Sequence, residues 1–178
     1  TGKDHEVVIT VEGQVGTFGS FFSYDAPIVT AVQPIYGPAA GGSTPVLTVY
    51  GSNFGSFGQA VATNVQVNGV SCTSATLQAG DTSILCGIPS NNKDSSGTAC
   101  TACNALDVDV QVEVSSLTGT KAGAFSFTRQ GTSSSDAGLW CNAIVIAYPT
   151  SPADGLVWID PGDTGSTFQV YCLQTEDG

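Results

Sequence analysis

The chain has 178 residues, and 41% of them are hydrophobic, which is enough to build a folded core. Only 11% are charged, and the formal net charge is −11. Nucleic-acid binding by phosphate neutralisation needs clustered cations, and the four basic residues are scattered, so this class is excluded. Docking on an anionic membrane is disfavoured for the same reason. A solvated acidic surface explains the charge, and calcium binding is the alternative.

No apolar run approaches the ~20 residues of a membrane helix, so no membrane insertion is expected. No basic segment followed by an apolar stretch begins at Thr1, so a signal peptide is not expected either. Both ends read as parts of something longer. The absence of Met and the scarcity of Lys and Arg disfavour long helices and favour β-structure.

Alternating apolar and polar residues predict a series of short strands. These lie at 7–11, 21–24, 45–50, 65–67, 82–86, 106–114 and 124–127. The Asn68-Gly69 dipeptide after the fourth strand is a strong signal for a tight hairpin, because both residues tolerate positive φ. In 106–114 the valines alternate with acids, which places one face on a core and the other in water. The pattern is typical of an all-β sandwich.

One internal repeat is visible. A valine-rich strand, a glycine-containing turn and a Phe-Ser-aromatic end occur at 7–24 and again at 108–127. Ser23 and Ser126 lie 103 positions apart, a plausible length for one sandwich domain. We therefore predict that residues 1–24 are the last two strands of a preceding copy. Two strands cannot bury a core alone, so they must pack on something outside this chain or on its own domain.

The character of the chain changes after this repeat. Residues 130–139 are polar and glycine-containing, which predicts a flexible linker. The tail from 140 to 178 is aromatic and interrupted by prolines.

The even number of cysteines indicates disulfides. Six can pair in 15 ways, and spacing alone does not choose among them. A zinc site would need paired CxxC knuckles, and only 100–103 has that form. Disulfides in an oxidising, extracellular compartment are the better explanation. The cysteines are Cys72, Cys86, Cys100, Cys103, Cys141 and Cys172.

Several motifs in family order resemble the IPT/TIG domain, the immunoglobulin-like fold of plexins, related receptors and some transcription factors. The motifs are Ala26-Pro27-Ile28 through Gln33-Pro34, Gly37-Pro38-Ala39-Ala40-Gly41-Gly42, Leu47 through Gly55, Val65 through Cys72, Ile84 through Pro89, and Phe125-Ser126-Phe127. The resemblance covers 25–129 and implies an immunoglobulin-like β-sandwich. It also implies a Cys72–Cys86 bond, as in extracellular members. The insertion 91–104 departs from the family, and we expect a loop bridge Cys100–Cys103, with a pairing elsewhere as the rival.

The tail resembles a second family, the N-terminal subdomain of fibrinogen-like domains. The resemblance rests on Cys141, then Asp154-Gly155-Leu156-Val157-Trp158-Ile159-Asp160-Pro161, Phe168-Gln169-Val170-Tyr171-Cys172 and Thr175-Glu176-Asp177-Gly178. It implies a Cys141–Cys172 bond in a partial, disulfide-linked fibrinogen-like segment over 140–178. That family's calcium and ligand sites lie in a part this chain does not contain, so they do not transfer.

No catalytic constellation is predicted. The sole histidine, His5, lies near a terminus, and Asp107 and Asp109 lie on the expected wet face of a strand, so we expect no enzyme and no cofactor. Asp160-Pro161-Gly162-Asp163, with Asp154, is the calcium candidate, and the same residues also suit an ordinary β-turn.

Carbohydrate is considered both as a modification of the chain and as a partner that the chain binds. No Asn-x-Ser/Thr sequon occurs, so conventional N-glycans are not expected. The Ser133-Ser134-Ser135 run and the Ser/Thr-rich loops permit O-linked sugars.

Two functions remain open. One is an extracellular structural module, a unit of a tandem IPT/TIG array in a filament, matrix or cell-surface appendage, which binds copies of itself through exposed strand edges. The other is the ectodomain of an adhesion or signalling receptor. DNA binding, as in the transcription-factor relatives, is contradicted by the acidity and the cysteines.

Overall fold

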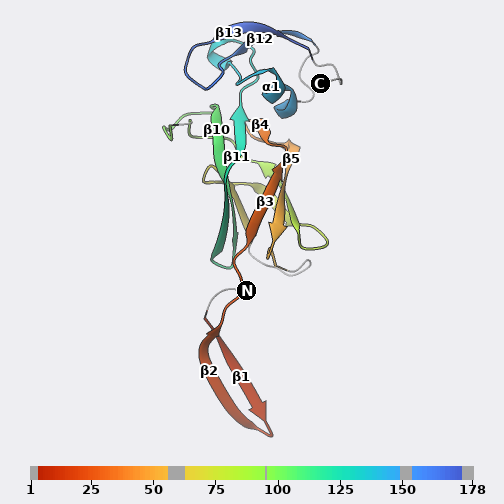
Figure 1. The fold of residues 1–178 in the computed structure, drawn as a ribbon, viewed down its shortest axis with the longest axis vertical. Helices are drawn as coiled ribbons and strands as arrows, with labels where there is room; N and C mark the ends of the chain where they lie inside the picture. The colour runs from red at the N-terminus through yellow and green to blue at the C-terminus, as the bar shows by residue number, and fades with distance from the viewer. Residues whose placement is uncertain (1–3, 56–62, 95, 149–153, 174–178) are drawn as a thin grey trace.

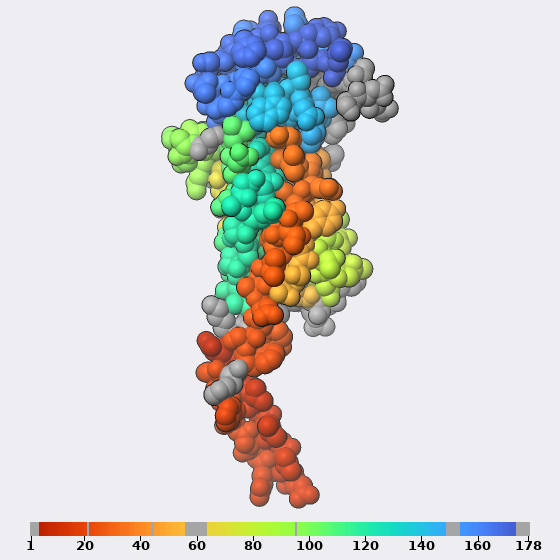
Figure 2. Space-filling view, in the orientation of Figure 1, coloured from red at the N-terminus to blue at the C-terminus, as the bar shows by residue number. Residues whose placement is uncertain are grey.

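The computed structural model describes residues 4–55, 63–94, 96–148 and 154–173. A β-sandwich forms the middle of the molecule, an N-terminal hairpin extends beyond one end of it, and a C-terminal unit lies on the other end (Figure 1). Figure 2 shows the hairpin as a narrow protrusion in the same orientation. The stretch 175–178, which took part in the fibrinogen-like resemblance, lies outside the described residues.

Two sheets face each other in the sandwich, which confirms the predicted all-β class. The first has the strand order β4 (Tyr36–Pro38), β11 (Leu117–Thr128), β10 (Ala105–Val114), β6 (Thr63–Val67) and β7 (Val70–Ser71). The second has the order β3 (Ile28–Gln33), β5 (Gly42–Ser52), β9 (Ser83–Ile88) and β8 (Thr73–Leu77). All strand neighbours are antiparallel except β11 and β4, which run parallel.

The core lies between these sheets and follows from the alternation in β10. Val108, Val110, Val112 and Val114 are buried, because successive side chains of a strand point to opposite faces. Phe125 and Phe127 of the neighbouring β11 are buried and meet edge to face, with ring centroids 5.0 Å apart. From the end of β5, Phe54 fills the sandwich with no exposed surface.

The predicted Asn68-Gly69 turn and a second turn at Gly41 connect neighbouring strands. Asn68 and Gly69 have φ of 54° and 74° and join β6 to β7, which is the conformation a two-residue hairpin loop needs. Gly41, with φ of 74°, turns the chain between β4 and β5. A Cβ at Gly41 would lie 2.5 Å from the backbone nitrogen of Ser90, so this turn also requires glycine for space.

Several strands are longer than the sequence pattern predicts. β11 begins at Leu117 rather than at 124, and β2 spans Gln14–Phe22 rather than 21–24. Glycines at 119 and 16 interrupt the pattern without interrupting the backbone pairing across each hairpin. β3 and β8 were not predicted, and β4 and β7 were implied only by the neighbouring turns, because short or half-exposed strands carry little alternation.

The segment 130–139 differs from the expected flexible linker, because it is folded against its neighbours. It holds a 3₁₀ helix, η1 (Ser134–Asp136), and the N–H of Gly131 donates to the carbonyl of Asp136 at 2.8 Å. Ala137 and Leu139 are buried. The polar composition of this segment therefore reflects a turn with internal hydrogen bonds.

The C-terminal unit consists of one short helix and one hairpin. Helix α1 (Cys141–Ala147) buries Ala143, Ile144 and Ala147 on one face. Strand β12 (Gly155–Ile159) pairs antiparallel with β13 (Phe168–Cys172). The helix was not predicted, because seven residues are too few for helical periodicity to be recognised.

Candidate interaction surface

The N-terminal hairpin, formed by β1 (His5–Val11) and β2 (Gln14–Phe22), repeats the β10–β11 hairpin of the sandwich pair for pair. Adding 103 to both numbers of any β1–β2 pair gives a β10–β11 pair. The matches are His5–Phe22 with Val108–Phe125, Val7–Phe18 with Val110–Lys121, Val8–Thr17 with Gln111–Thr120, Ile9–Gly16 with Val112–Gly119, Thr10–Val15 with Glu113–Thr118, and Val11–Gln14 with Val114–Leu117. The two hairpins therefore share their strand register as well as their residue types.

The irregular positions of the two hairpins also coincide. Both turns use two residues at positive φ, Glu12 and Gly13 in one and Ser115 and Ser116 in the other. Each hairpin then carries one further positive-φ residue in its second strand, Ser20 and Gly123, again 103 positions apart. Turns and bulges fix strand register, so this agreement makes the two hairpins the same structural element.

A side-chain hydrogen bond at the base of each hairpin is shared as well. The N–H of Asp4 donates to Oγ of Ser23 at 3.1 Å, and the N–H of Asp107 donates to Oγ of Ser126 at 3.0 Å. Both aspartates have positive φ, at 56° and 49°.

The two hairpins differ in what covers them. Val112 and Phe125 are 0% and 1% exposed in the sandwich, whereas their counterparts Ile9 and Phe22 are 61% and 50% exposed. In the described structure, β1 and β2 contact each other and touch other elements only sparsely. The hairpin projects away from the sandwich (Figure 1), so its apolar side faces solvent. We call this side, made by Val7, Ile9, Val11, Phe22 and Tyr24, the hairpin face.

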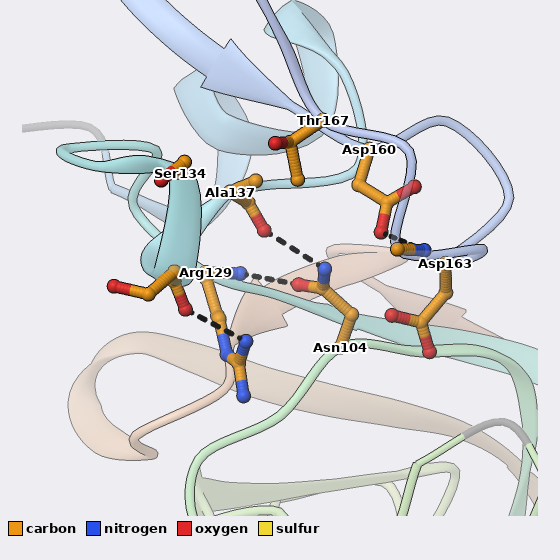
Figure 3. A pocket seen from close by; sticks show the side chains of 9 residues that line it. Asn104, Arg129, Ser134, Ala137, Asp160, Asp163 and Thr167 are labelled. Carbon is orange, nitrogen blue, oxygen red and sulfur yellow. Dashed lines mark hydrogen bonds between the residues drawn. The ribbon is translucent and has the colours of Figure 1, made fainter.

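A second feature lies where the sandwich meets the C-terminal unit. A polar hollow of about 380 Å³ lies between the two parts (Figure 3). Asn104 is buried in its wall, its Nδ2 donates to the carbonyl of Ala137 at 2.9 Å, and its Oδ1 accepts from the N–H of Arg129 at 2.8 Å. The Arg129 guanidinium donates to the carbonyls of Ala102 and Ser135, at 2.9 and 3.1 Å. These polar side chains fix the segment 130–139, which carries the C-terminal unit, to the end of the sandwich.

The calcium candidate lies at the edge of this hollow and is engaged by its own loop. Asp160 is buried, and its carboxylate accepts from the N–H groups of Thr164 and Gly165 at 3.0 and 2.8 Å. The N–H of Asp163 donates to the carbonyl of Asp160 at 3.1 Å, which closes the turn that the sequence also allowed. The described residues contain no group of three or more His, Cys, Asp or Glu side chains suited to a metal ion.

The residues considered for catalysis take other places in the fold. His5 packs edge to face on Tyr24, with ring centroids 5.6 Å apart, at the base of the hairpin. Asp107 and Asp109 are exposed on β10, as expected. Oδ1 of Asp109 accepts from the N–H of Gly123 at 3.1 Å, so this carboxylate supports the bulge between β10 and β11. The structure does not bring His5 together with either aspartate.

All six cysteines are paired in the structure. Cys72 bonds Cys86 and Cys141 bonds Cys172, the two pairs that the family resemblances implied. Cys100 bonds Cys103 within the inserted loop. The Cα atoms of the three pairs lie 5.7, 5.6 and 6.1 Å apart, within the reach of a disulfide.

Sequence reasoning missed Asn104, Arg129 and the glycine pair Gly16 and Gly119. The glycines were detectable, because they align at the same 103-residue offset as Ser23 and Ser126. Asn104 and Arg129 carried no recognisable signal, since Asn104 bonds Ala137, 33 positions away, and Arg129 bonds Ala102, 27 positions away, as well as Ser135.

Comparison with known proteins agrees with this geometry. The family model of the IPT/TIG domain matches residues 27–128, more than half of the chain. That range covers the whole sandwich and leaves out the hairpin and the C-terminal unit. No curated protein matches the chain. Among the described residues, no helix is long and apolar enough to cross a membrane. Because the IPT/TIG model covers the two-sheet sandwich from its first strand to its last, this chain belongs to the IPT/TIG family of immunoglobulin-like domains.

Proposed function

We propose that the chain is an extracellular structural module, one unit of a tandem IPT/TIG array in a filament, matrix or cell-surface appendage, and that it performs no catalysis. One observation carries the proposal: a second copy of the β10–β11 hairpin stands beside a complete sandwich, with the hairpin face uncovered. An exposed apolar sheet face of this kind is a docking element for protein.

The same observation supports a domain division. Residues 1–24 are the last strands of one IPT/TIG unit, 25–129 are the next unit, and 140–178 form a separate disulfide-linked piece that we propose to be fibrinogen-like. The segment 130–139 joins the last two and forms hydrogen bonds within itself and with Trp158 of β12.

Composition supports an extracellular site of action. Three disulfides persist in oxidising compartments and are rare in reducing ones. With 11% charged residues, the surface relies on hydroxyls and amides, and the net charge of −11 makes copies repel each other, so contact between copies has to come from apolar faces and is favoured by salt.

The receptor ectodomain is the second candidate, and the hollow beside Arg129 favours it. Asp160, Asp163 and Thr167 line this hollow with Arg129, so it offers both a cation and hydrogen-bonding groups to a polar ligand such as carbohydrate. Among the described residues, its lining includes no aromatic ring, and its buried polar groups already have partners there. The structural role therefore ranks first.

Electron microscopy of the native source material tests the proposal. We expect fibrils or a regular lattice with a repeat that matches one IPT/TIG unit. Monodisperse monomers at high protein concentration would contradict the structural role. For the receptor alternative, a glycan array probed with the wild-type chain and with Arg129→Ala is the matching measurement. Binding that Arg129→Ala abolishes would favour the receptor.

A further inference from the structure

We propose that the hairpin face is covered by an IPT/TIG half-sandwich that lacks its own last two strands, and that this half-sandwich lies N-terminal to His5 in the same polypeptide. The inference rests on the proposed tandem array and names what the hairpin binds. Three features of the hairpin support it.

The first feature is the chemistry of the face. In the sandwich, the equivalent side of β10–β11 is buried against the opposite sheet, including Val32, Leu47 and Val49. The hairpin face keeps apolar side chains at the matching positions, with Ile9 for Val112 and Phe22 for Phe125. A surface equivalent to the β3–β5 sheet therefore complements it in shape and polarity.

The second feature is Gly16. Its counterpart Gly119 is a glycine because the backbone at the start of β3 passes there: a Cβ at Gly119 would overlap the carbonyl of Pro27, the residue before β3. At Gly16 the nearest atom to such a Cβ, among the described residues, is the carbonyl oxygen of Ile9 at 4.0 Å. Glycine weakens a strand, and nothing local requires it here. The close approach of a partner backbone, equivalent to Pro27, explains it.

The third feature is the two edges of the hairpin. In the sandwich, β10 pairs antiparallel with β6 from Val110 to Val114, and β11 pairs parallel with β4 from Ser126 to Thr128. At the same offset, β1 offers the edge Val7–Val11 to a strand equivalent to β6. The chain around Ser23 and Tyr24 offers its edge to a strand equivalent to β4.

The occupant follows from these edges. A second copy of this chain does not fit, because its β6 and β4 already pair with β10 and β11. A half-sandwich without these two strands has both edges open. In this chain, the strands that complete β10–β11 all precede them in the sequence, from β3 to β9. The same order places the strands that complete β1–β2 before His5.

Hydrogen exchange measured by mass spectrometry tests the proposal by comparing the complete polypeptide from its source with the 178-residue chain. We expect peptides spanning β1 and β2 to exchange about tenfold or more slowly in the complete polypeptide. Peptides from β5 and β9 serve as the internal reference and should exchange equally in both. Equal exchange of β1–β2 in the two proteins would overturn the proposal.

Two variants make the test specific. Gly16→Val adds a side chain where the partner backbone approaches, so β1–β2 should lose its protection in the complete polypeptide. Thr17→Val, on the opposite side of the same strand, should retain it. Valine favours strands, so lost protection in Gly16→Val would not come from a weaker hairpin. If both variants stay protected, the half-sandwich does not dock as proposed.

The remaining outcomes separate this inference from the function on which it rests. Protection that appears in the 178-residue chain and rises with its concentration means docking between copies, which overturns the assignment to the preceding segment. Fibrils in the native material with fast exchange in β1–β2 overturn the docking and leave the structural role standing. Slow exchange in β1–β2 without fibrils supports the docking and contradicts the structural role.

Discussion

Gly119 of β11 lies against the backbone of Pro27, so that no side chain fits between the two strands. This contact is where the last hairpin of the sandwich crosses the first strand of the opposite sheet, and β11 and β3 contact each other along it. Gly16, its counterpart in the N-terminal hairpin, has open space in the same direction.

This difference predicts unequal effects of the same substitution at the two sites in the 178-residue chain. Gly119→Val should lower the free energy of unfolding of the sandwich by about 2–4 kcal/mol, because two backbones must separate to admit the side chain. Gly16→Val should leave it unchanged within ~0.5 kcal/mol. Urea unfolding followed by circular dichroism measures both. Equal losses would show that the two glycines have the same surroundings.

Asn104 is predicted to control the joint between the sandwich and the C-terminal unit. In Asn104→Ala, the carbonyl of Ala137 loses its hydrogen-bond donor and the N–H of Arg129 loses its acceptor, because both groups bond the buried Asn104 side chain. This variant should lower the free energy of unfolding by about 2–3 kcal/mol. Ser134→Ala, at an exposed position on the same hollow, is the matched control and should cost little. Proteolysis between 130 and 139 should accelerate in Asn104→Ala alone; if both variants are cleaved alike, Asn104 does not hold the joint.

Removing the disulfides is predicted to have unequal effects. Cys141 and Cys172 are 31 positions apart, and chain-entropy arguments give that bond about 3–4 kcal/mol. Cys100 and Cys103 are 3 positions apart, and the same argument gives about 1.5 kcal/mol. Unfolding of the paired Cys→Ser variants, compared with the wild-type chain, measures each contribution. A larger loss from the 100–103 pair would mean that the inserted loop, rather than the C-terminal unit, depends on its bond.

Tyr148 is predicted to make the protein less stable at alkaline pH. Burial, and then the charge of Asp136, raise the pKa of Tyr148 from 10.0 to about 12, and its hydroxyl donates to the carbonyl of Thr128. The unfolded chain releases this proton first, so the contribution of Tyr148 to stability is fully present below about pH 10 and is lost between pH 10 and 12. Tyr148→Phe should flatten that part of the stability profile. If the stability of Tyr148→Phe falls as steeply as that of the wild-type chain between pH 10 and 12, other groups cause the fall.

Some features of this protein were predictable from the sequence because they depend on short-range order. The alternation in 106–114 indicates which side of β10 is buried, and Asn68-Gly69 indicates a tight turn, since each is set by backbone geometry within a few residues. The 103-residue repeat was visible for the same reason, because it reproduces local patterns at a fixed distance.

Other features were decided only by contacts between distant parts of the chain. The segment 130–139 is ordered because Asn104 and Trp158 supply hydrogen bonds to it, which its polar composition does not reveal. Gly16 and Gly119 occupy equivalent positions in two hairpins of the same register, and the sequence does not show that their surroundings differ. The tertiary structure does, because burial and steric exclusion depend on which strand lies opposite: β3 covers Gly119, and no described strand covers Gly16.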